Sequence, residues 1–377
     1  MNILYLTVTG ETVGGAEISL YNLLENLDRD KFKPFVVMPF EGDYTQKISQ
    51  LDIPVIILPL RKVKNPFNII HSKRTLNRLV EIIREYKIDL VHSNTQTGGI
   101  AFLGSLASRR AGIPFIWHPR VKWSGRILDL IQVFLSTKII VISRAAKKRF
   151  LWVPSKNKIV IIYNGVNLER FNPSVDAVSF RKEFGCEKNT PLIGALGVSH
   201  PRKRYEYLIQ SAKLVAEEIP GVRFVIVGFD LNRQDNYLTR LKKLTESMGL
   251  ENTVAFMEKR DDIPEVLSAL DVFVFTSVSD AFGRVLIEAM ASAKPVVAFR
   301  GGAVPEIVED EKTGFLLDAK DFEGMAEKIT YLLKHKEVRD EFGRSGKQRA
   351  EQLFDIKEHT RRVESLYLEL LEEKKVS

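Results

Sequence analysis

Two carboxylates flank a short turn in the second half of the chain. Asp280 and Glu288 stand eight residues apart in the stretch SDAFGRVLIEAMASAKPVVAF, residues 279–299. The apolar run VFVFTS before them predicts a buried strand, and a helix is expected to begin near Arg284. Because the first amides of a helix have no intrahelical partner and carry the positive end of its dipole, this turn predicts a phosphate site.

The acids indicate what accompanies the phosphate. Two carboxylates make little electrostatic sense beside a bare anion, which they would repel. Glu288 lies about one turn inside the expected helix, where its oxygens can hold vicinal hydroxyls such as those of a ribose. Asp280, before the turn, can reach hydroxyls of a group beyond the phosphates. The pair therefore fits a diphosphate with a polyol on each side, which is a nucleotide sugar.

Cations follow another predicted strand. The stretch LGVSHPRKRYEYLI, residues 196–209, carries Arg202 and Lys203 just before a helix. Two cations there can offset diphosphate charge both in the bound state and on departure. A solvated helix cap is the plain alternative, and since Arg204 adds a third charge, not all three need be functional.

A glycine pair follows the first predicted strand. The stretch TGETVGGAE, residues 9–17, places Gly14 and Gly15 between that strand and the first helix, where glycine lets the backbone approach a ligand closely. A tight turn explains such a pair equally well.

Strands and helices alternate in both halves of the chain. The expected strands are NILYLTV, PFVVMPF, PVIILPL, DLVHSN, PFIWH, KIIVIS and KIVIIYNG, then PLIGALG, RFVIVG, TVAFM, VFVFTS, PVVAF and TGFLLD. Near-continuous apolar strands separated by amphipathic helices predict parallel sheets covered on both faces. Residues 164–175, which lack a clear period, read as a linker. We expect an α/β protein with two doubly wound, Rossmann-like domains facing a cleft, 1–170 on the acceptor side and 171–355 on the donor side.

Composition limits the class of protein. With 377 residues, 45% of them hydrophobic, the chain can form two domains with a core each. A single cysteine, Cys186, excludes an internal disulfide framework and a cysteine-rich metal site, which fits a reducing cytoplasm. The apolar stretch at the start, MNILYLTVTGE, lacks the basic n-region of a signal peptide and is too short to span a membrane. The six histidines lack metal-ligand spacing, so no metal is expected.

The net charge of +8 is unevenly distributed. Residues 101–150 hold ten Lys or Arg against one acid, Asp129, and all three tryptophans, Trp117, Trp123 and Trp152, lie in or beside this stretch. Cations interleaved with Trp suit an anionic membrane interface, which we expect over residues 101–153 on the inner face of a plasma membrane. The alternatives are a solvated basic face and a core position for Trp117. Nucleic acid is not expected, because no helix-turn-helix, zinc or RNP-like pattern is found.

Several stretches together match one family. The set VGGAE, IWH, YNGV, PRK and DAFGRVLIEAMA, followed by KPVVA, GGAVPEIV and TGFLL, resembles in order and spacing the retaining glycosyltransferases of family 4, which have the GT-B fold. The resemblance covers essentially the whole chain and is densest in its second half. It implies that the C-terminal helix, 356–377, with its apolar stripe at helical spacing, crosses back onto the first domain.

The resemblance also implies roles for the donor-binding residues. Glu288 matches the second acid of the family's E-x7-E motif, which holds the donor ribose, and Asp280 stands where the first Glu contacts the transferred sugar. The backbone from Phe282 through Gly283 and Arg284 to Val285 would face the diphosphate.

Two further residues match the family pattern. Lys203 matches the phosphate-binding lysine. His118, which closes PFIWH, matches the histidine beside the sugar; from the residues alone, a structural histidine at a strand end is the alternative.

The implied reaction needs no cofactor beyond the donor, a UDP- or GDP-sugar. The acceptor hydroxyl would attack the anomeric carbon on the face that the leaving diphosphate departs, so that configuration is kept without a metal. The loops HSNTQTGG (92–99) and HPRVKWSGR (118–126) should border an anionic, lipid-linked or surface-glycan acceptor.

Two positions depart from the family. Asp280 is one methylene, about 1.5 Å, shorter than Glu, and Val198 stands where a second phosphate-binding Arg is common. Arg202 can substitute for it from one turn later. These departures leave open a nucleotide-sugar-binding protein with little or no transfer activity, and a GT-B nucleotide-sugar isomerase remains a further alternative.

Overall fold

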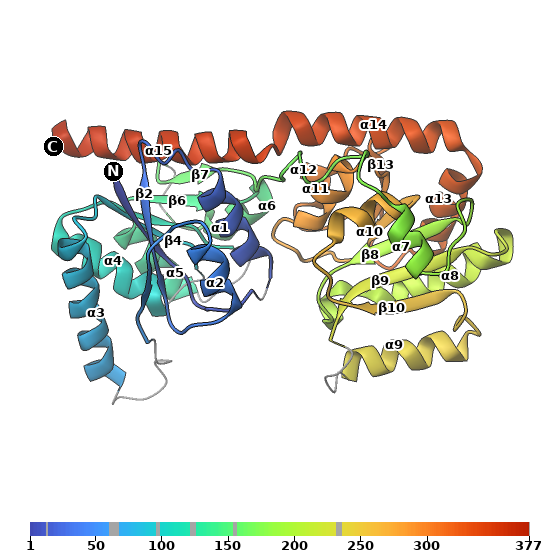
Figure 1. Cartoon of the computed structure of the whole chain (residues 1–377), viewed down its shortest axis with the longest axis horizontal. Coiled ribbons are helices and arrows are strands. Elements are labelled where there is room, and N and C mark those ends of the chain that lie inside the picture. Colours follow the sequence, from blue (N-terminus) through green and yellow to red (C-terminus); the bar gives the residue numbers. More distant parts are fainter. Residues whose placement is uncertain are drawn as a thin grey trace. The chain divides into compact units, whose positions relative to one another are not determined.

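The computed structural model describes residues 1–12, 14–59, 68–95, 99–120, 126–153, 157–230 and 236–376, without the side chains of 68–72, 126 and 374–376. The chain divides into two compact units. Unit 1 combines Met1–Gly165 with Ile356–Ser377, and unit 2 is Val166–Asp355. Figure 1 shows that each unit is a β-sheet flanked by helices.

Unit 1 contains a seven-stranded parallel sheet of order β3-β2-β1-β4-β5-β6-β7 within the described residues. Its strands are β1 (Asn2–Leu6), β2 (Lys33–Met38), β3 (Val55–Ile57), β4 (Leu90–Ser93), β5 (Phe115–Trp117), β6 (Lys138–Val141) and β7 (Ile159–Ile161). Its helices are α1 (Gly15–Glu25), α2 (Asp43–Ser49), α3 (Asn68–Glu85), α4 (Gly99–Ala111), α5 (Arg126–Leu135), α6 (Arg144–Lys147), the 3₁₀ turn η1 (Lys148–Phe150) and α15 (Ile356–Val376).

Unit 2 contains a six-stranded parallel sheet of order β10-β9-β8-β11-β12-β13. Its strands are β8 (Leu192–Leu196), β9 (Arg223–Phe229), β10 (Val254–Glu258), β11 (Val272–Phe275), β12 (Val296–Phe299) and β13 (Gly314–Leu317). Its helices are α7 (Val178–Glu183), the 3₁₀ turn η2 (Pro201–Lys203), α8 (Tyr205–Glu218), α9 (Asn236–Ser247), α10 (Ile263–Ala269), α11 (Arg284–Ala291), α12 (Val304–Ile307), α13 (Phe322–Lys334) and α14 (Lys336–Leu353).

Each sheet has a point where the strand order reverses. In unit 1 the chain runs outward from β1 through β2 to β3 and then returns to place β4 on the other side of β1. In unit 2, β9 and β10 extend one way from β8, and β11 to β13 extend the other. Ligands of open parallel sheets bind at the carboxyl ends of the strands beside such a reversal. Ligand-binding sites are therefore expected at these two reversals.

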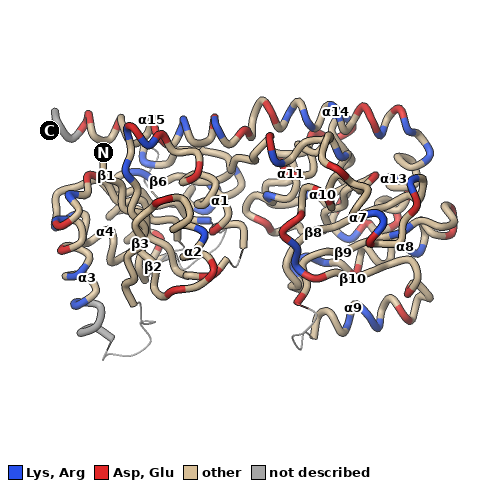
Figure 2. Tube along the Cα trace, viewed as in Figure 1, with Lys and Arg blue, Asp and Glu red and all other residues tan. Residues whose placement is uncertain are grey.

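The last helix, α15, belongs to the core of unit 1. Its stripe of Val363, Leu366, Tyr367 and Leu370 is buried and packs with core residues from β1 and α1. Figure 1 shows α15 running along this unit, and Figure 2 shows acidic and basic residues interspersed along α14 and α15. The predicted apolar stripe thus has a partner surface, and the mixed charges lie on the solvent side.

The predicted α/β architecture is confirmed, and every expected strand is present. Several strands are shorter than their apolar runs. The run KIVIIYNG gives only Ile159–Ile161, and the following backbone leaves the sheet so that Val166 can form an isolated bridge with Asp355. The unit boundary falls between Gly165 and Val166, at the start of the expected linker rather than after residue 170.

Only some residues of the basic stretch 101–150 lie at the surface. Trp117 is fully buried in β5, so the core alternative holds for it, while Trp152 is about half exposed. Arg149 is buried and forms an ion pair with Asp129 at 2.5 Å, the one acid of the stretch. Lys122 and Trp123 lie outside the described residues. No helix in the described parts of the chain is both long and apolar enough to cross a membrane.

Candidate active site

Two loops meet at the strand reversal of unit 2. One follows β8 and leads through η2 to Lys203, and the other follows β11 and leads to Asp280. The Thr276 hydroxyl, just after β11, donates a 2.5 Å hydrogen bond to the carbonyl of Lys203 and ties the loops together. Residues 77 positions apart in sequence are thereby held at one sheet edge.

Lys203 and Asp280 form a direct ion pair. Nζ of Lys203 lies 2.6 Å from Oδ2 of Asp280, and the two side chains are only 11% and 12% exposed. The Lys203 ammonium also lies 5.2 Å from the ring centroid of Phe275. The sequence predicted each residue as a ligand contact but not that they pair. The pair places a cation and a carboxylate side by side, an arrangement that can contact a phosphate and a neighbouring hydroxyl.

The turn between Asp280 and α11 depends on two glycines. Gly283, the residue that caps α11, has φ of +90°, a conformation that side chains rarely adopt. Gly302 has φ of +52°, and a Cβ there would lie 2.2 Å from the carbonyl oxygen of Asp280. The Phe282 ring is buried against Phe354. A ligand at this turn would therefore meet the backbone of Phe282 rather than its side chain.

Glu288 lies inside α11 and is paired with a residue of the same helix. Its Oε1 accepts a hydrogen bond from Nη2 of Arg284 at 2.5 Å, and the carboxylate is 5% exposed. The expected helix start at Arg284 is confirmed. From the sequence, only the backbone of Arg284 was expected to face the diphosphate. In the structure, the Arg284 side chain also donates a hydrogen bond to Glu288.

Buried hydroxyls at the same strand ends escaped the sequence prediction. Oγ of Ser199, after β8, and Oγ of Ser277, after β11, are buried without a hydrogen-bond partner among the described residues. Buried polar atoms are normally paired, so each of these hydroxyls needs a partner, such as a water or a polar ligand, that the described protein atoms do not supply. The sequence signal that could have identified these serines is their position just past the end of a buried strand.

The two residues discussed as phosphate-binding positions near η2 are not buried. Val198 is 43% exposed, and Arg202 is exposed on η2.

The glycine pair of unit 1 opens α1. Gly14 precedes the helix and has an extended backbone, with φ of −170°, and its amide donates to Oε2 of Glu17 at 3.0 Å. A Cβ added at Gly15 would meet nothing within 4 Å in the described part of the chain. Neither residue has the positive φ that a glycine-only turn requires. Burial raises the pKa of Glu17.

Polar side chains also gather at the carboxyl ends of β4 and β5. His118 follows β5, is fully buried, and has its Nδ1 3.1 Å from Nε2 of His92 on β4. Arg120 donates to the side-chain oxygens of Asn94 at 2.6 Å and Asn164 at 2.5 Å. The structure thus joins the loops 92–99 and 118–126, of which 96–98 and 121–125 lie outside the described residues.

The buried histidines of unit 1 are held neutral. Burial lowers the pKa of His118 well below its usual range, and the positive charge of Arg120 lowers it further. The same two causes lower the pKa of His92. For His359 on α15, burial lowers the pKa to about 4. A neutral imidazole can accept or donate a hydrogen bond but does not carry the charge of a general acid.

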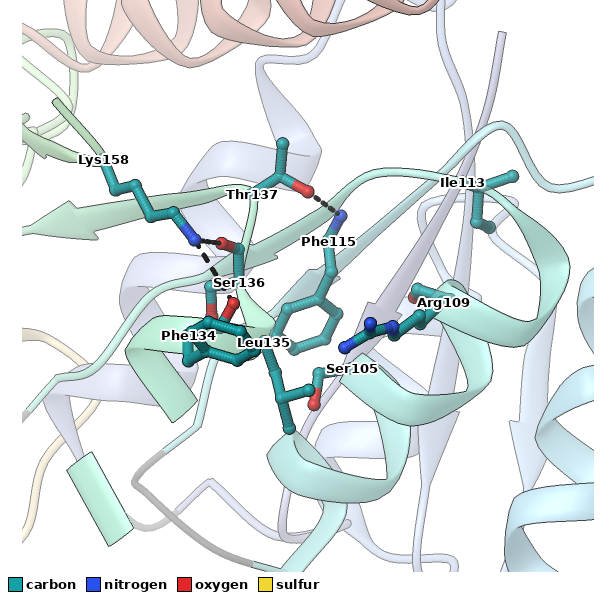
Figure 3. Close-up of a pocket in the computed structure, with 10 residues that line it drawn as sticks. Ser105, Arg109, Ile113, Phe115, Phe134, Leu135, Ser136, Thr137 and Lys158 are labelled. Atoms are coloured by element: carbon teal, nitrogen blue, oxygen red, sulfur yellow. Dashed lines mark hydrogen bonds between the residues drawn. The ribbon is translucent and has the colours of Figure 1, made fainter. Parts of the chain in front are cut away.

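The cavity of about 500 Å³ shown in Figure 3 lies elsewhere in unit 1. It is lined by residues of α4 and α5 and by Phe115 and Thr137, which stand at the amino ends of β5 and β6. The ammonium of Lys158 donates to the carbonyls of Val133, Phe134 and Ser136 and closes the end of α5. This is the edge opposite the carboxyl ends of the strands, so we place the site at the reversals instead.

No cluster of three or more His, Cys, Asp or Glu side chains suited to a metal ion occurs in the described residues. At the reversal of unit 2, Lys203 and the N-terminus of α11 carry positive charge.

Family models match both halves of the chain. Residues 13–170 match the model "Glycosyltransferase Family 4", and residues 177–349 match "Glycosyl transferases group 1". A known relative, the UDP-Gal:α-D-GlcNAc-diphosphoundecaprenol α-1,3-galactosyltransferase of Escherichia coli, is 25% identical over 94% of this chain and 97% of its own length.

Solved structures of other proteins are similar to this chain over nearly its whole length. HepE of Anabaena in complex with UDP is 27% identical, with a TM-score of 0.85 over 97% of this chain and 99% of that one. A glycosyltransferase of Rickettsia africae has a TM-score of 0.87 at 22% identity over 98% of both chains, which supports the fold.

Two doubly wound units, each with polar groups at its strand reversal, define a protein of the GT-B fold. Together with the family matches over both units, they show that the chain belongs to the glycosyltransferases of family 4.

Proposed function

We propose that this glycosyltransferase is a retaining, metal-independent enzyme that moves a sugar from a UDP-sugar to a hydroxyl of a lipid-linked or surface-glycan acceptor. The observation that carries the proposal is the Lys203–Asp280 pair beside the N-terminus of α11, at the strand reversal of unit 2. It combines positive charge for a diphosphate with a carboxylate for sugar hydroxyls. UDP is favoured over GDP because HepE, similar over its whole length, has been solved with UDP and with UDP-glucose.

The reaction exchanges one bond at the anomeric carbon for another. The bond from that carbon to the diphosphate oxygen breaks while the acceptor oxygen bonds to the carbon on the same face. The acceptor proton passes to the departing phosphate oxygen. Lys203 and the α11 amides stabilise the charge that develops on the diphosphate, which is the task a divalent metal performs in other transferases. His118 orients the transferred sugar, and Glu288 holds the ribose.

Transfer should therefore keep the anomeric configuration and survive a chelator. Incubation with UDP-glucose, UDP-galactose or UDP-N-acetylglucosamine and a polyprenyl-diphosphate-linked sugar is expected to give an α-linked product from one of these α-linked donors. Proton NMR of the product and a parallel reaction in EDTA measure both properties. A β-linked product would rule out retention, and loss of turnover in EDTA would rule out metal independence. Hydrolysis or epimerisation of the donor without transfer would favour the isomerase or binding-protein alternatives.

The acceptor proposal is supported by an apolar surface on unit 1. This apolar surface consists of the exposed α5 side chains and two residues that follow η1: Ile127, Leu128, Leu130, Ile131, Phe134, Leu151 and Trp152. The buried Arg149–Asp129 pair holds η1 against α5. Exposed cations occur in the same stretch, at Arg109, Arg110, Arg144 and Lys148. We propose that this surface rests on an anionic membrane on the cytoplasmic side, where a lipid-linked acceptor would be presented.

Removing apolar area from this surface should weaken membrane binding. Ile127 and Phe134 are 76% and 73% exposed, and each would bury most of a large side chain in lipid. The double variant Ile127→Ser/Phe134→Ser is expected to bind anionic vesicles at least about tenfold more weakly in co-sedimentation.

The matched control is Leu353→Ser/Leu368→Ser, because both leucines are exposed but lie on α14 and α15. It should bind like the wild type, and high salt should weaken binding to anionic vesicles only. Equal binding of both double variants, or equal binding to neutral vesicles at every salt concentration, would contradict the membrane proposal.

A further inference from the structure

Arg284 stands at a position of α11 where its charge opposes the helix dipole. It is the first residue after the Gly283 cap, and the first turn of α11 contains no acid. Because that end of a helix is positive, a cation there is unfavourable. Its partner Glu288 follows four residues later, and a pair of this spacing is more stable with the acid first. The stability of the helix therefore gives no reason for this order of charges.

The pair is also placed where charges are costly. The Arg284 and Glu288 side chains are only 14% and 5% exposed, and every other buried residue of α11 is apolar. Nη2 of Arg284 donates to Oε1 of Glu288 at 2.5 Å. Nη1 of Arg284 is buried and has no hydrogen-bond partner among the described residues. The guanidinium thus holds the carboxylate with one nitrogen and has a second nitrogen to offer.

The charges at the strand reversal indicate what Nη1 binds. Asp280 is paired with Lys203 at 2.6 Å, and Glu288 is paired with Arg284, so each acid has one cation. A water can accept a hydrogen bond from Nη1 but brings no charge. A phosphate would answer both Nη1 and the first amides of α11, which belong to the same turn as Arg284 and lack intrahelical partners.

We propose that Arg284 is a second cation of the donor site, with Nη2 holding Glu288 and Nη1 donating to the diphosphate. The inference rests on the proposed function, because it takes the diphosphate of the donor as the acceptor of that bond. Arg284 would then supply the charge that the family pattern lacks here, where Val198 stands at the position of a common second Arg. Arg202, the substitute suggested by the sequence, is exposed on η2.

This role also accounts for an acid beside a diphosphate. Without a cation next to it, the Glu288 carboxylate would repel the phosphates. The ion pair with Arg284 offsets that charge through Oε1, which is the Glu288 oxygen that is hydrogen-bonded within the described residues. Oε2 therefore remains for the ribose hydroxyls, so a single pair can serve the ribose and the diphosphate together.

The test must separate a contact with the diphosphate from an effect through Glu288. Arg284→Met alone does not, because it leaves a buried carboxylate unpaired, which destabilises the fold and repels the ligand. The informative comparison is between Arg284→Met/Glu288→Gln and Glu288→Gln, since neither has a carboxylate at position 288. Arg284→Gln/Glu288→Gln, which keeps a polar side chain at both positions, serves the same comparison should the methionine variant fail to fold.

The matched control is Arg339→Met/Glu288→Gln. Arg339 lies on α14, is 18% exposed and forms an ion pair at 3.7 Å with Asp271. Asp271 immediately precedes β11 and so lies at the amino ends of the strands, the edge opposite the proposed site. It keeps its 3.0 Å ion pair with Arg181 when Arg339 is replaced. This control removes an arginine of similar burial without touching the strand reversal.

The readout is the ratio of the Kd for uridine to the Kd for UDP, measured on the full-length protein by ligand-observed NMR. Uridine shares the base and the ribose with UDP, so the ratio reports only the contribution of the diphosphate. The ratio should be roughly tenfold lower in Arg284→Met/Glu288→Gln than in Glu288→Gln, as the loss of one charge-assisted hydrogen bond predicts. The Arg339 control should have the ratio of Glu288→Gln.

A ratio in Arg284→Met/Glu288→Gln within about twofold of that in Glu288→Gln would overturn the role of Arg284. So would an equal fall in the Arg339 control, because the effect would then not be local. Failure of the proposed function looks different. If the wild type binds neither UDP nor uridine, the donor site itself is refuted and the role of Arg284 with it. If the wild type binds UDP more tightly than uridine while the ratio ignores Arg284, only this inference is refuted.

Discussion

Replacing Lys203 with methionine should lower the kcat for transfer by roughly 10²–10³ and weaken donor binding, because the diphosphate loses the cation that stabilises its developing charge. Methionine keeps much of the volume of the lysine stem and removes only the ammonium. Kinetics at saturating acceptor measure the effect.

The same change leaves Asp280 with a mostly buried carboxylate that has lost its 2.6 Å partner, which is itself destabilising. The double variant Lys203→Met/Asp280→Asn removes both charges and should recover stability without recovering kcat. Lys213→Met, on α8 and 46% exposed, controls for loss of a positive charge and should keep full activity. A single Lys203→Met variant with more than about a tenth of wild-type kcat would contradict the role of Lys203.

Unit 1 should lose unfolding free energy between pH 7 and pH 5, about 2 kcal/mol of it from His359, with His92 and His118 adding to the loss in the same direction. Burial lowers the pKa of all three in the folded chain, to about 4 for His359. The unfolded chain therefore binds these protons first, and stability is lost as the pH falls below about 6.5. For His359 the loss ends near its folded pKa of about 4. Glu17 acts the other way, since burial raises its pKa.

Tryptophan fluorescence during urea unfolding measures this directly, because all three tryptophans belong to unit 1. His359→Gln should remove about 2 kcal/mol of the loss between pH 7 and pH 5. His335→Gln, which changes an exposed histidine of unit 2, should leave it unchanged. An unfolding free energy for unit 1 that is flat between pH 7 and pH 5 would show that these histidines are not held neutral.

The fold was largely readable from the sequence. Apolar β-branched runs separated by amphipathic helices locate every strand, because a sheet buried on both faces tolerates little else. Strand ends were less predictable: the apolar run that contains β7 continues past Ile161, but the backbone leaves the sheet there. The apolar stripe of α15 was visible, whereas the surface it covers depends on contacts more than 300 residues apart, such as that of Tyr367 with Tyr5.

The candidate site was predicted as single residues rather than as an arrangement. Spacing and turn chemistry identified Lys203, Asp280 and Glu288, because charged residues after buried strands lie at one sheet edge. The pairing of Lys203 with Asp280 and of Glu288 with Arg284 depends on side-chain rotamers that spacing does not determine. For the same reason, spacing does not reveal that His92 lies between His118 and Tyr367.

The central claim, that the strand reversal of unit 2 binds the donor nucleotide, is tested most directly by calorimetric titration of the purified protein with UDP, GDP and ADP, repeated with Glu288→Gln. One UDP per chain should bind, more tightly than GDP or ADP. Glu288→Gln should bind UDP roughly ten- to a hundredfold more weakly, because hydrogen bonds from the ribose hydroxyls to a carboxylate are lost. Equal affinity for UDP in a folded Glu288→Gln variant, or no binding of any of the three nucleotides to the wild type, would contradict the claim.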